Sequence, residues 1–114
     1  MRILLAEDDP DYQQYFRTML PEHEVIPANT LASVMDQASK QRFDIVVLDL
    51  GLPDADGLET FLLLAARQLG LPVFILTANE DETLEERCLQ LGAQDYMLKA
   101  HATRISLSHA LRRA

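Results

Sequence analysis

Short apolar runs alternate along the chain with longer stretches of helical periodicity. Three runs are apolar at every position, Ile3–Ala6, Ile45–Leu48 and Val73–Leu76, which is typical of parallel strands covered by helices on both faces. Glu24–Pro27 predicts a weaker strand at the edge of the sheet, because a proline lacks the N–H that an inner strand donates. Tyr96–Leu98 predicts a fifth strand.

Five helices are predicted between and after these strands. In the first, apolar residues recur at i, i+3, i+4, i+7 and i+8, with Asp9 as N-cap and Pro10 as first helical residue. Shorter stretches of the same spacing predict the next three helices, and a less clear periodicity predicts the last. The positions predicted to face the core are Tyr12, Tyr15, Phe16, Met19 and Leu20; Leu31, Val34, Met35 and Ala38; Leu58, Phe61, Leu62, Ala65 and Leu69; Leu84, Cys88 and Leu91; and Ile105, Leu107 and Leu111.

This succession of strand and helix, repeated five times, predicts an α/β fold. We expect a flavodoxin-like, doubly wound five-stranded parallel sheet of order 2-1-3-4-5 with helices on both faces. The 114 residues suit one domain that fills positions 1–114.

Composition and charge narrow the class of protein. A net charge of -8 argues against direct contact with nucleic acid, because binding to a phosphate backbone requires clustered Lys and Arg. The single cysteine and the absence of a long apolar run indicate a cytoplasmic protein that neither forms an internal disulfide nor crosses a membrane.

Polar side chains stand where four of the five predicted strands end. The first strand ends in Asp8 and Asp9, the third in Asp49, the fourth in Thr77, and the fifth leads into Lys99. Ligands bind at the carboxyl ends of the strands in this fold. Three carboxylates gathered there would repel one another without a cation, and an Asp-rich edge without histidine favours Mg²⁺ over zinc. A hydroxyl and an ammonium beside them suit the transfer of a phosphoryl group.

Each of these residue types also has a structural role when taken alone. An Asp before a proline can cap a helix, an Asp after a strand can open a turn, and a lysine is usually solvated. We therefore assign the chemistry to the combination, and we give Asp54 and Asp56 turn and cap roles.

Four segments resemble the motifs of response-regulator receiver domains from bacterial two-component phosphorelay systems. Residues 49–57, Asp-Leu-Gly-Leu-Pro-Asp-Ala-Asp-Gly, resemble the family's D-L-x-L-P-x-x-D-G signature. Residues 7–9 resemble its acidic pair, residues 75–78 its fourth-strand ending, and residues 92–99 its G-A-x-D-Y-x-x-K segment. The order and spacing of these segments match over the whole chain.

The resemblance implies a phosphorylation-dependent signalling switch. It is not an enzyme with an external substrate, since it would promote only its own phosphorylation and dephosphorylation. Asp49 would accept the phosphoryl group from the phosphohistidine of a sensor kinase or phosphotransfer protein. Asp8, Asp9, Asp49 and the backbone carbonyl of Gly51 would hold Mg²⁺.

The resemblance also implies a path from the phosphoryl group to a surface. Thr77 and Lys99 would contact the phosphoryl oxygens, and the rotamer of Tyr96 would follow the movement of Thr77. The altered surface would comprise the last two predicted helices and the strand between them, where a homodimer or an output module would form its contacts. The final helix reaches Ala114 without a glycine or proline, so an output domain beyond residue 114 is expected.

The sequence departs from the family pattern at one position, and two alternative functions remain to be considered. Ala100 follows Lys99 where most members have a proline after a cis bond, so we expect a trans bond and a different path for the loop. This departure gives some weight to a pseudo-receiver that binds a partner without phosphorylation. A Mg²⁺-dependent phosphatase with Asp49 as nucleophile is less favoured, since Gly51 stands where haloacid-dehalogenase-like enzymes carry a second carboxylate.

Overall fold

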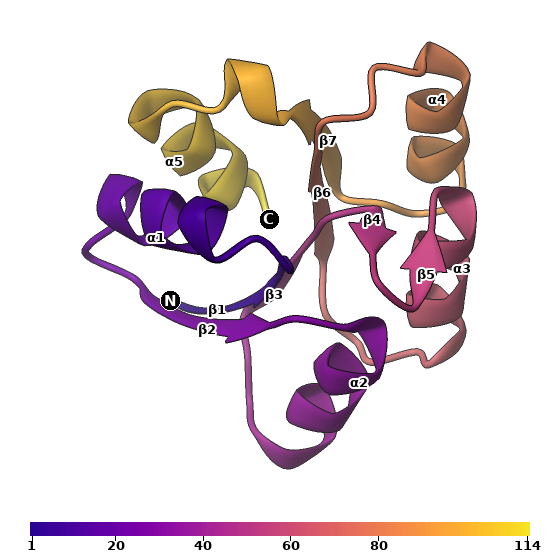
Figure 1. The fold of residues 1–114 in the computed structure, drawn as a ribbon, viewed down its shortest axis with the longest axis horizontal. Coiled ribbons are helices and arrows are strands. Elements are labelled where there is room, and N and C mark those ends of the chain that lie inside the picture. The colour runs from indigo at the N-terminus through magenta and orange to yellow at the C-terminus, as the bar shows by residue number, and fades with distance from the viewer.

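The computed structural model describes residues 1–114 and contains one five-stranded parallel sheet (Figure 1). The strand order is β2-β1-β3-β6-β7, which confirms the predicted order 2-1-3-4-5. A separate two-stranded antiparallel hairpin, β4-β5, was not predicted. The strands are β1 (Arg2–Ala6), β2 (Glu24–Ala28), β3 (Ile45–Leu48), β4 (Gly51–Leu52), β5 (Ala55–Asp56), β6 (Val73–Thr77) and β7 (Asp95–Leu98).

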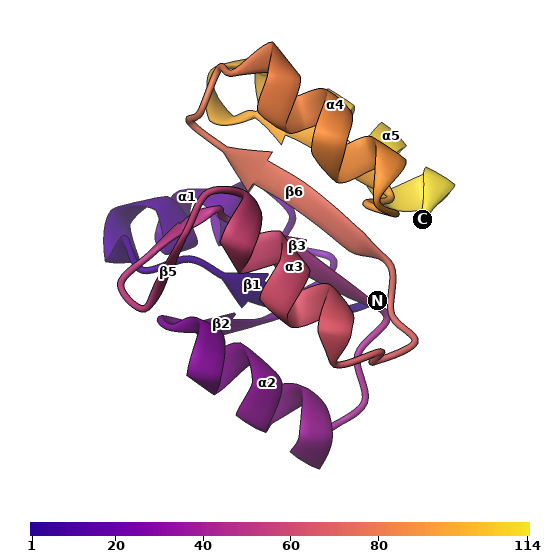
Figure 2. The ribbon, with the colours of Figure 1, turned by 90° about the vertical axis from the view of Figure 1, so that its right-hand side faces the viewer.

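Helices cover both faces of the sheet, as predicted (Figures 1 and 2). The two helices on one face share a core cluster with one set of strand side chains, and the other three share a cluster with the opposite set. None of the helices is both long enough and apolar enough to span a membrane. The helices are α1 (Pro10–Met19) and α5 (Arg104–Arg113) on the first face, α2 (Leu31–Lys40), α3 (Leu58–Ala66) and α4 (Glu82–Gln90) on the second, and a 3₁₀ turn, η1 (Lys99–His101).

The central strands are buried on both sides because their apolar side chains alternate between the two clusters. In β1, Ile3 and Leu5 pack with α1 and α5, whereas Leu4 packs with the residues of α2, α3 and α4. All four residues of β3 have an exposed fraction of 0%. Continuous apolar runs therefore indicated the correct strands.

Side-chain caps fix where the helices begin. Asp9 accepts a hydrogen bond from the N–H of Asp11 at 2.9 Å, and Pro10 is the first residue of α1, as predicted. Thr30 accepts from the N–H of Ser33 at 3.0 Å at the start of α2. Each cap satisfies a donor that has no partner within its own helix.

The prediction of which helix residues face the core was partly wrong. In α3, Leu64 rather than Leu62 turns inward, because this helix is apolar around most of its circumference and the spacing does not single out one face. Leu91 is the C-cap of α4 and lies beyond its last turn. Five residues predicted to face the core are exposed: Tyr15, Leu62, Ala65, Leu91 and Ile105.

Candidate functional site

Asp49 lies at the carboxyl end of the sheet, directly after β3. Its N–H donates to the carbonyl of Ala6 at 3.0 Å, which continues the pairing of β1 with β3 by one residue. Its side chain is only 10% exposed. One of its oxygens, Oδ1, accepts a hydrogen bond from the N–H of Gly51 at 3.2 Å. The other oxygen, Oδ2, points to a cation.

That cation is Lys99, which begins η1 after the end of β7. Its Nζ lies 2.9 Å from Oδ2 of Asp49 and 2.5 Å from Oε1 of Glu7. The Nζ also lies 4.4 Å from the centre of the Tyr12 ring, a cation–π contact. The Lys99 side chain is 19% exposed, so its charge is held close to both carboxylates with little screening by water.

Three carboxylates come together around this lysine. One ligand atom from each of Glu7, Asp8 and Asp49 lies within 4.8 Å of the others. Asp8 is exposed, whereas Glu7 and Asp49 are buried. The three carboxylates and the one ammonium together carry a formal charge of −2. Carboxylate oxygens are the ligands that a hard divalent cation prefers. The residues present therefore fit Mg²⁺.

The structure brings Asp8 and Asp49 together but does not bring Asp9 into this cluster. Asp9 has extended backbone and its carboxylate caps α1. Its place beside Asp49 is taken by Glu7, which the sequence analysis did not select. Ala6 pairs with the last residue of β3, so Glu7 and Asp49 are equivalent first residues after neighbouring strands. Comparing the two strand ends by register would have identified Glu7 from the sequence.

Burial and charge shift the pKa values inside the cluster. Burial raises the pKa of Glu7 above its ordinary value, although the hydrogen bond from Lys99 opposes this shift. For Lys99, burial acts to lower the pKa, but the hydrogen bonds to Glu7 and Asp49 outweigh burial and raise the pKa above its ordinary value. Lys99 therefore stays charged wherever the carboxylates are ionised.

Thr77 and Tyr96 share a hydrogen-bond partner, Asn79. Thr77, the last residue of β6, is 3% exposed, and its hydroxyl accepts a hydrogen bond from the N–H of Asn79 at 3.4 Å. The hydroxyl of Tyr96 in β7 donates to the backbone carbonyl of Asn79 at 2.9 Å. No hydrogen bond joins Thr77 to Asp49 or Lys99. The loop at Asn79 thus connects the strand end at Thr77 with the buried ring of Tyr96.

Two hydrogen-bond acceptors, the carbonyl of Leu50 and the carboxylate of Asp54, anchor the segment that follows Asp49. The carbonyl of Leu50 accepts from the hydroxyl of Thr60 and from the N–H of Gly57, both at 2.9 Å. Asp54 accepts from the N–H groups of Leu31 at 2.8 Å and of Ala32 at 3.0 Å, at the start of α2. These backbone bonds hold the pKa of Asp54 below its ordinary value.

The Asp54 contacts give that residue a cap role, as predicted, although the helix it caps is α2 rather than the helix that follows the loop. No peptide bond in the chain is cis, so the Lys99–Ala100 bond is trans, as expected from the alanine.

Comparison with known proteins points to one family. The family model for the response regulator receiver domain matches residues 3–111. KdpE of Escherichia coli, the KDP operon transcriptional regulatory protein, is 34% identical over 99 residues, which cover 85% of this chain and 44% of KdpE. BasR, a transcriptional regulatory protein of E. coli, is 35% identical over 112 residues, which cover 90% of this chain and 47% of BasR. The chain spans about half the length of these relatives.

Solved structures agree with the sequence comparison. The receiver domain of the Pseudomonas aeruginosa sensor histidine kinase PA1611, solved with a magnesium ion in its active-site cleft, matches with a TM-score of 0.82 at 33% identity, covering 98% of this chain and 94% of that one. The receiver domain of the Francisella response regulator 1452 matches with a TM-score of 0.86 at 22% identity, covering 98% and 94%. The second match shows the fold alone.

Proposed function

The chain belongs to the response regulator receiver domain family of two-component systems, and we propose that it is a switch that accepts a phosphoryl group on Asp49. Receiver domains are signalling domains, so no external substrate is turned over. The observation that carries the proposal is the grouping of Asp49 with the Lys99 ammonium and the carboxylates of Glu7 and Asp8.

The residues around Asp49 would perform the transfer by position and charge. An oxygen of Asp49 would attack the phosphorus of a phosphohistidine, the new O–P bond would form as the P–N bond breaks, and the imidazole would leave with the electron pair. Lys99 already contacts Asp49 at 2.9 Å, so its ammonium is in reach of phosphoryl oxygens bonded there. Little covalent work is required of the protein in such a reaction.

Glu7, Asp8 and Asp49 are the residues that would hold Mg²⁺, with the backbone carbonyl of Gly51 as a further oxygen ligand. When bound, the ion would offset negative charge on the phosphoryl oxygens. The excess negative charge of the cluster supports this role, and so does the magnesium named in the Pseudomonas relative. Asp9 would remain the cap of α1.

The signal would leave the site through Asn79. Thr77 would turn to donate its hydroxyl to a phosphoryl oxygen and would give up the N–H of Asn79. Because Tyr96 donates to the carbonyl of the same residue, a shift of this loop would change the position of the Tyr96 ring. The surface formed by α4, β7 and α5 would then present a different shape to its partner.

The partners follow from this scheme. The phosphoryl donor would be a sensor histidine kinase or a phosphotransfer protein. The receiver would act on an output module, since KdpE and BasR are transcriptional regulatory proteins about twice as long as the matched region. That module would contact the surface formed by α4, β7 and α5, and a homodimer that forms on phosphorylation would use the same surface.

Intact-protein mass after incubation with acetyl phosphate tests the proposal. The chain should gain the mass of one phosphoryl group with Mg²⁺, and should gain nothing after chelation or with Asp49→Asn. Asp56→Asn is the matched control, because Asp56 lies seven residues after Asp49 in β5, is exposed and has no side-chain hydrogen bond. If the chain gains no mass and also fails to bind beryllium fluoride, it is a binding module that acts without phosphorylation.

A further inference from the structure

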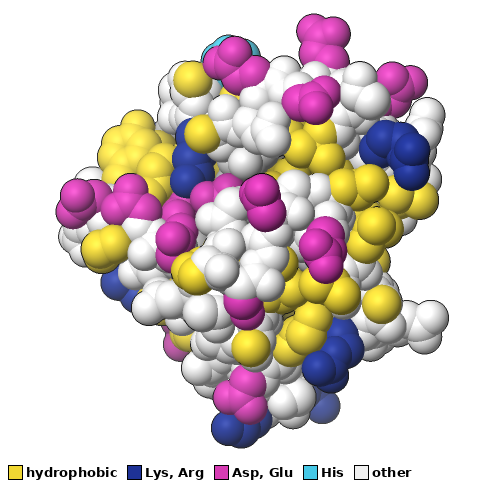
Figure 3. All heavy atoms as spheres, turned by 45° about the vertical axis from the view of Figure 1, so that its right-hand side comes forward, with side chains coloured by type: hydrophobic (Ala, Val, Ile, Leu, Met, Phe, Trp, Pro, Cys, Tyr) yellow, Lys and Arg dark blue, Asp and Glu magenta, His cyan; other side chains and the backbone are white.

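Helix α3 carries far more apolar surface than the core uses. Seven of its nine residues are Leu, Phe or Ala. Only Phe61 and Leu64 among these are buried, while Leu62 is 43% exposed and Leu63 is 42% exposed. A helix that is hydrophobic on nearly all sides is normally buried on nearly all sides. Figure 3 shows hydrophobic side chains gathered between charged ones on this side of the molecule.

The exposed face of α3 ends in opposite charges. Glu59 lies in its first turn, and Arg67 is the C-cap, with backbone that still has helical φ and ψ angles. Positions 59, 62, 63, 66 and 67 follow the spacing i, i+3, i+4, i+7 and i+8, so they share one face. Neither Glu59 nor Arg67 takes part in any ion pair of the protein. Both charges are therefore available to a partner.

The arrangement of these charges is symmetric about Leu63. Glu59 lies four residues before Leu63, and Arg67 lies four residues after it, so each charge is about 6 Å from Leu63 along the helix axis. If two copies pack antiparallel about a two-fold axis at Leu63, Glu59 of each copy meets Arg67 of the other. Leu62 and Ala66 then lie between the two ion pairs. This is the self-complementarity that a two-fold interface requires.

We propose that the exposed face of α3, made of Glu59, Leu62, Leu63, Ala66 and Arg67, is the contact between two copies of this chain. It differs from the surface of α4, β7 and α5, at which an output module and a homodimer that forms on phosphorylation are proposed to make their contacts. The inference does not depend on phosphorylation of Asp49.

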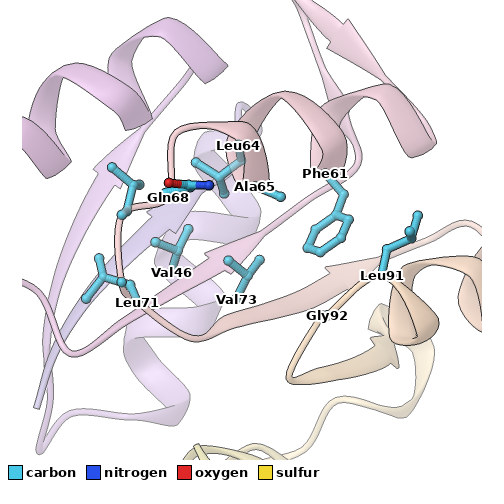
Figure 4. Close-up of a pocket in the computed structure, with 11 residues that line it drawn as sticks. Val46, Phe61, Leu64, Ala65, Gln68, Leu71, Val73, Leu91 and Gly92 are labelled. Carbon is cyan, nitrogen blue, oxygen red and sulfur yellow. The ribbon is translucent and has the colours of Figure 1, made fainter.

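The surroundings of α3 leave room for side chains of the second copy. A hollow of about 400 Å³ lies between α2 and α3, and Leu31, Met35, Leu63 and Ala66 contribute to its lining. On the other side of α3, a smaller hollow of about 180 Å³ is lined largely by apolar residues, which Figure 4 shows. Leucine side chains from an antiparallel helix can enter the first hollow as that helix lies along α3.

The contact would be a weak one. One helix with one flanking hollow offers less area than the roughly 1,600 Å² of a standard interface. Association is therefore expected to depend on protein concentration, and sedimentation velocity up to about 1 mM covers the range in which weak contacts form.

Charge exchange tests the pairing in the 114-residue chain without a phosphoryl donor. Glu59→Arg and Arg67→Glu should each weaken dimerisation by about tenfold or more, because each places like charges opposite one another twice. The double variant Glu59→Arg/Arg67→Glu should restore it, because both pairs are rebuilt with their signs exchanged. Circular dichroism of each variant checks that these exposed substitutions leave the fold intact.

Arg112→Glu on α5 is the matched control, since Arg112 is exposed and lies on the surface proposed for the phosphorylated dimer, which is not expected to form without a phosphoryl donor. It should leave the dimer unchanged. A chain that stays monomeric up to about 1 mM would overturn the inference. So would a dimer that Arg112→Glu dissociates while the α3 variants do not, or a folded double variant that fails to recover dimerisation.

Discussion

Replacing Lys99 by methionine tests how the acidic cluster is held together. The substitution removes the ammonium that lies 2.9 Å from Asp49 and 2.5 Å from Glu7, and methionine keeps an apolar stem against the ring of Tyr12. The side chains left behind are only 2% exposed at Glu7 and 10% exposed at Asp49. Two buried carboxylates would then repel each other without a compensating cation.

The expected loss follows from this burial. Removing one partner of a buried ion pair costs about 3–5 kcal/mol. Because the Lys99 side chain is 19% exposed, we expect the lower end, about 3 kcal/mol at pH 7, in a chelating buffer. For a domain of this size the loss corresponds to roughly 12 °C in Tm.

The loss should shrink in acid. Lys99 acts to lower the pKa of Glu7, against the effect of burial, so the pKa of Glu7 rises further in the variant. The folded state then binds a proton more readily than the unfolded state, and protonation relieves the repulsion. The variant should therefore lose less stability relative to the wild type at pH 5 than at pH 7. Added Mg²⁺ should restore part of the loss at pH 7.

Urea unfolding followed by circular dichroism measures these differences. Lys40→Met is the matched control, because Lys40 pairs with Asp36 at 3.1 Å but is 68% exposed, and such helix pairs contribute about 0.3–0.5 kcal/mol. A loss for Lys99→Met in chelator that is no larger than the loss for Lys40→Met would refute the idea that Lys99 compensates buried charge.

Three further predictions concern single residues. Asp54→Ala should lower the free energy of unfolding by about 1 kcal/mol at pH 7 through loss of the α2 cap. Because the folded pKa of Asp54 is depressed, this difference should persist above about pH 4 and fade below it, and Asp56→Ala should show neither effect. Tyr12→Phe removes a buried hydroxyl that has no partner, so urea unfolding should show equal or higher stability, and a loss above about 1 kcal/mol would contradict this account. Gly92→Ala should cost about 1 kcal/mol in thermal unfolding, because Gly92 has a φ of 111° that side chains rarely adopt, and unchanged stability would argue against backbone strain there.

The strands were predictable from the sequence because burial on both faces of the sheet produces a continuous run of apolar residues. Every position of a central strand must be apolar when helices cover both sides, and Ile45–Leu48 is observed with the predicted bounds. The edge position of β2 was predictable from one proline. The short strands β4 and β5 were not, since two residues each are too few for any periodicity.

The faces of the helices were less predictable, because periodicity identifies a buried face only where the other face is polar. In α1, Phe16 and Met19 are buried as predicted, whereas Tyr15 is exposed and meets Tyr12 edge to face, with ring centres 5.7 Å apart. In α3 both faces are apolar, so Leu62 and Leu64 were equally plausible from the spacing.

Of the acidic residues after the first strand, the sequence analysis selected Asp8 and Asp9, whereas the structure gathers Glu7 and Asp8 with Asp49. Any of Glu7, Asp8 and Asp9 satisfies a pattern of carboxylates after the first strand. What separates them is the backbone: β1 ends at Ala6, so Glu7 continues the strand direction into the acidic cluster, whereas Asp9 has already turned to cap α1. The predicted run Ile3–Ala6 ends at the same residue as β1. Aligning this end with the end of Ile45–Leu48 places Glu7 beside Asp49, and the acidic pattern alone does not include that alignment.

The proline in β2 also affects how readily this protein aggregates at high concentration. The N–H of Glu24 donates to Met1 and the carbonyl of Ala28 accepts from Glu7, so alternate residues of β2 face β1, and the nitrogen of Pro27 faces the open side. Unpaired donors along an open strand are where foreign strands attach and aggregates grow. Pro27 removes one such donor, which makes the outer border of the sheet a poor template for amyloid-like extension.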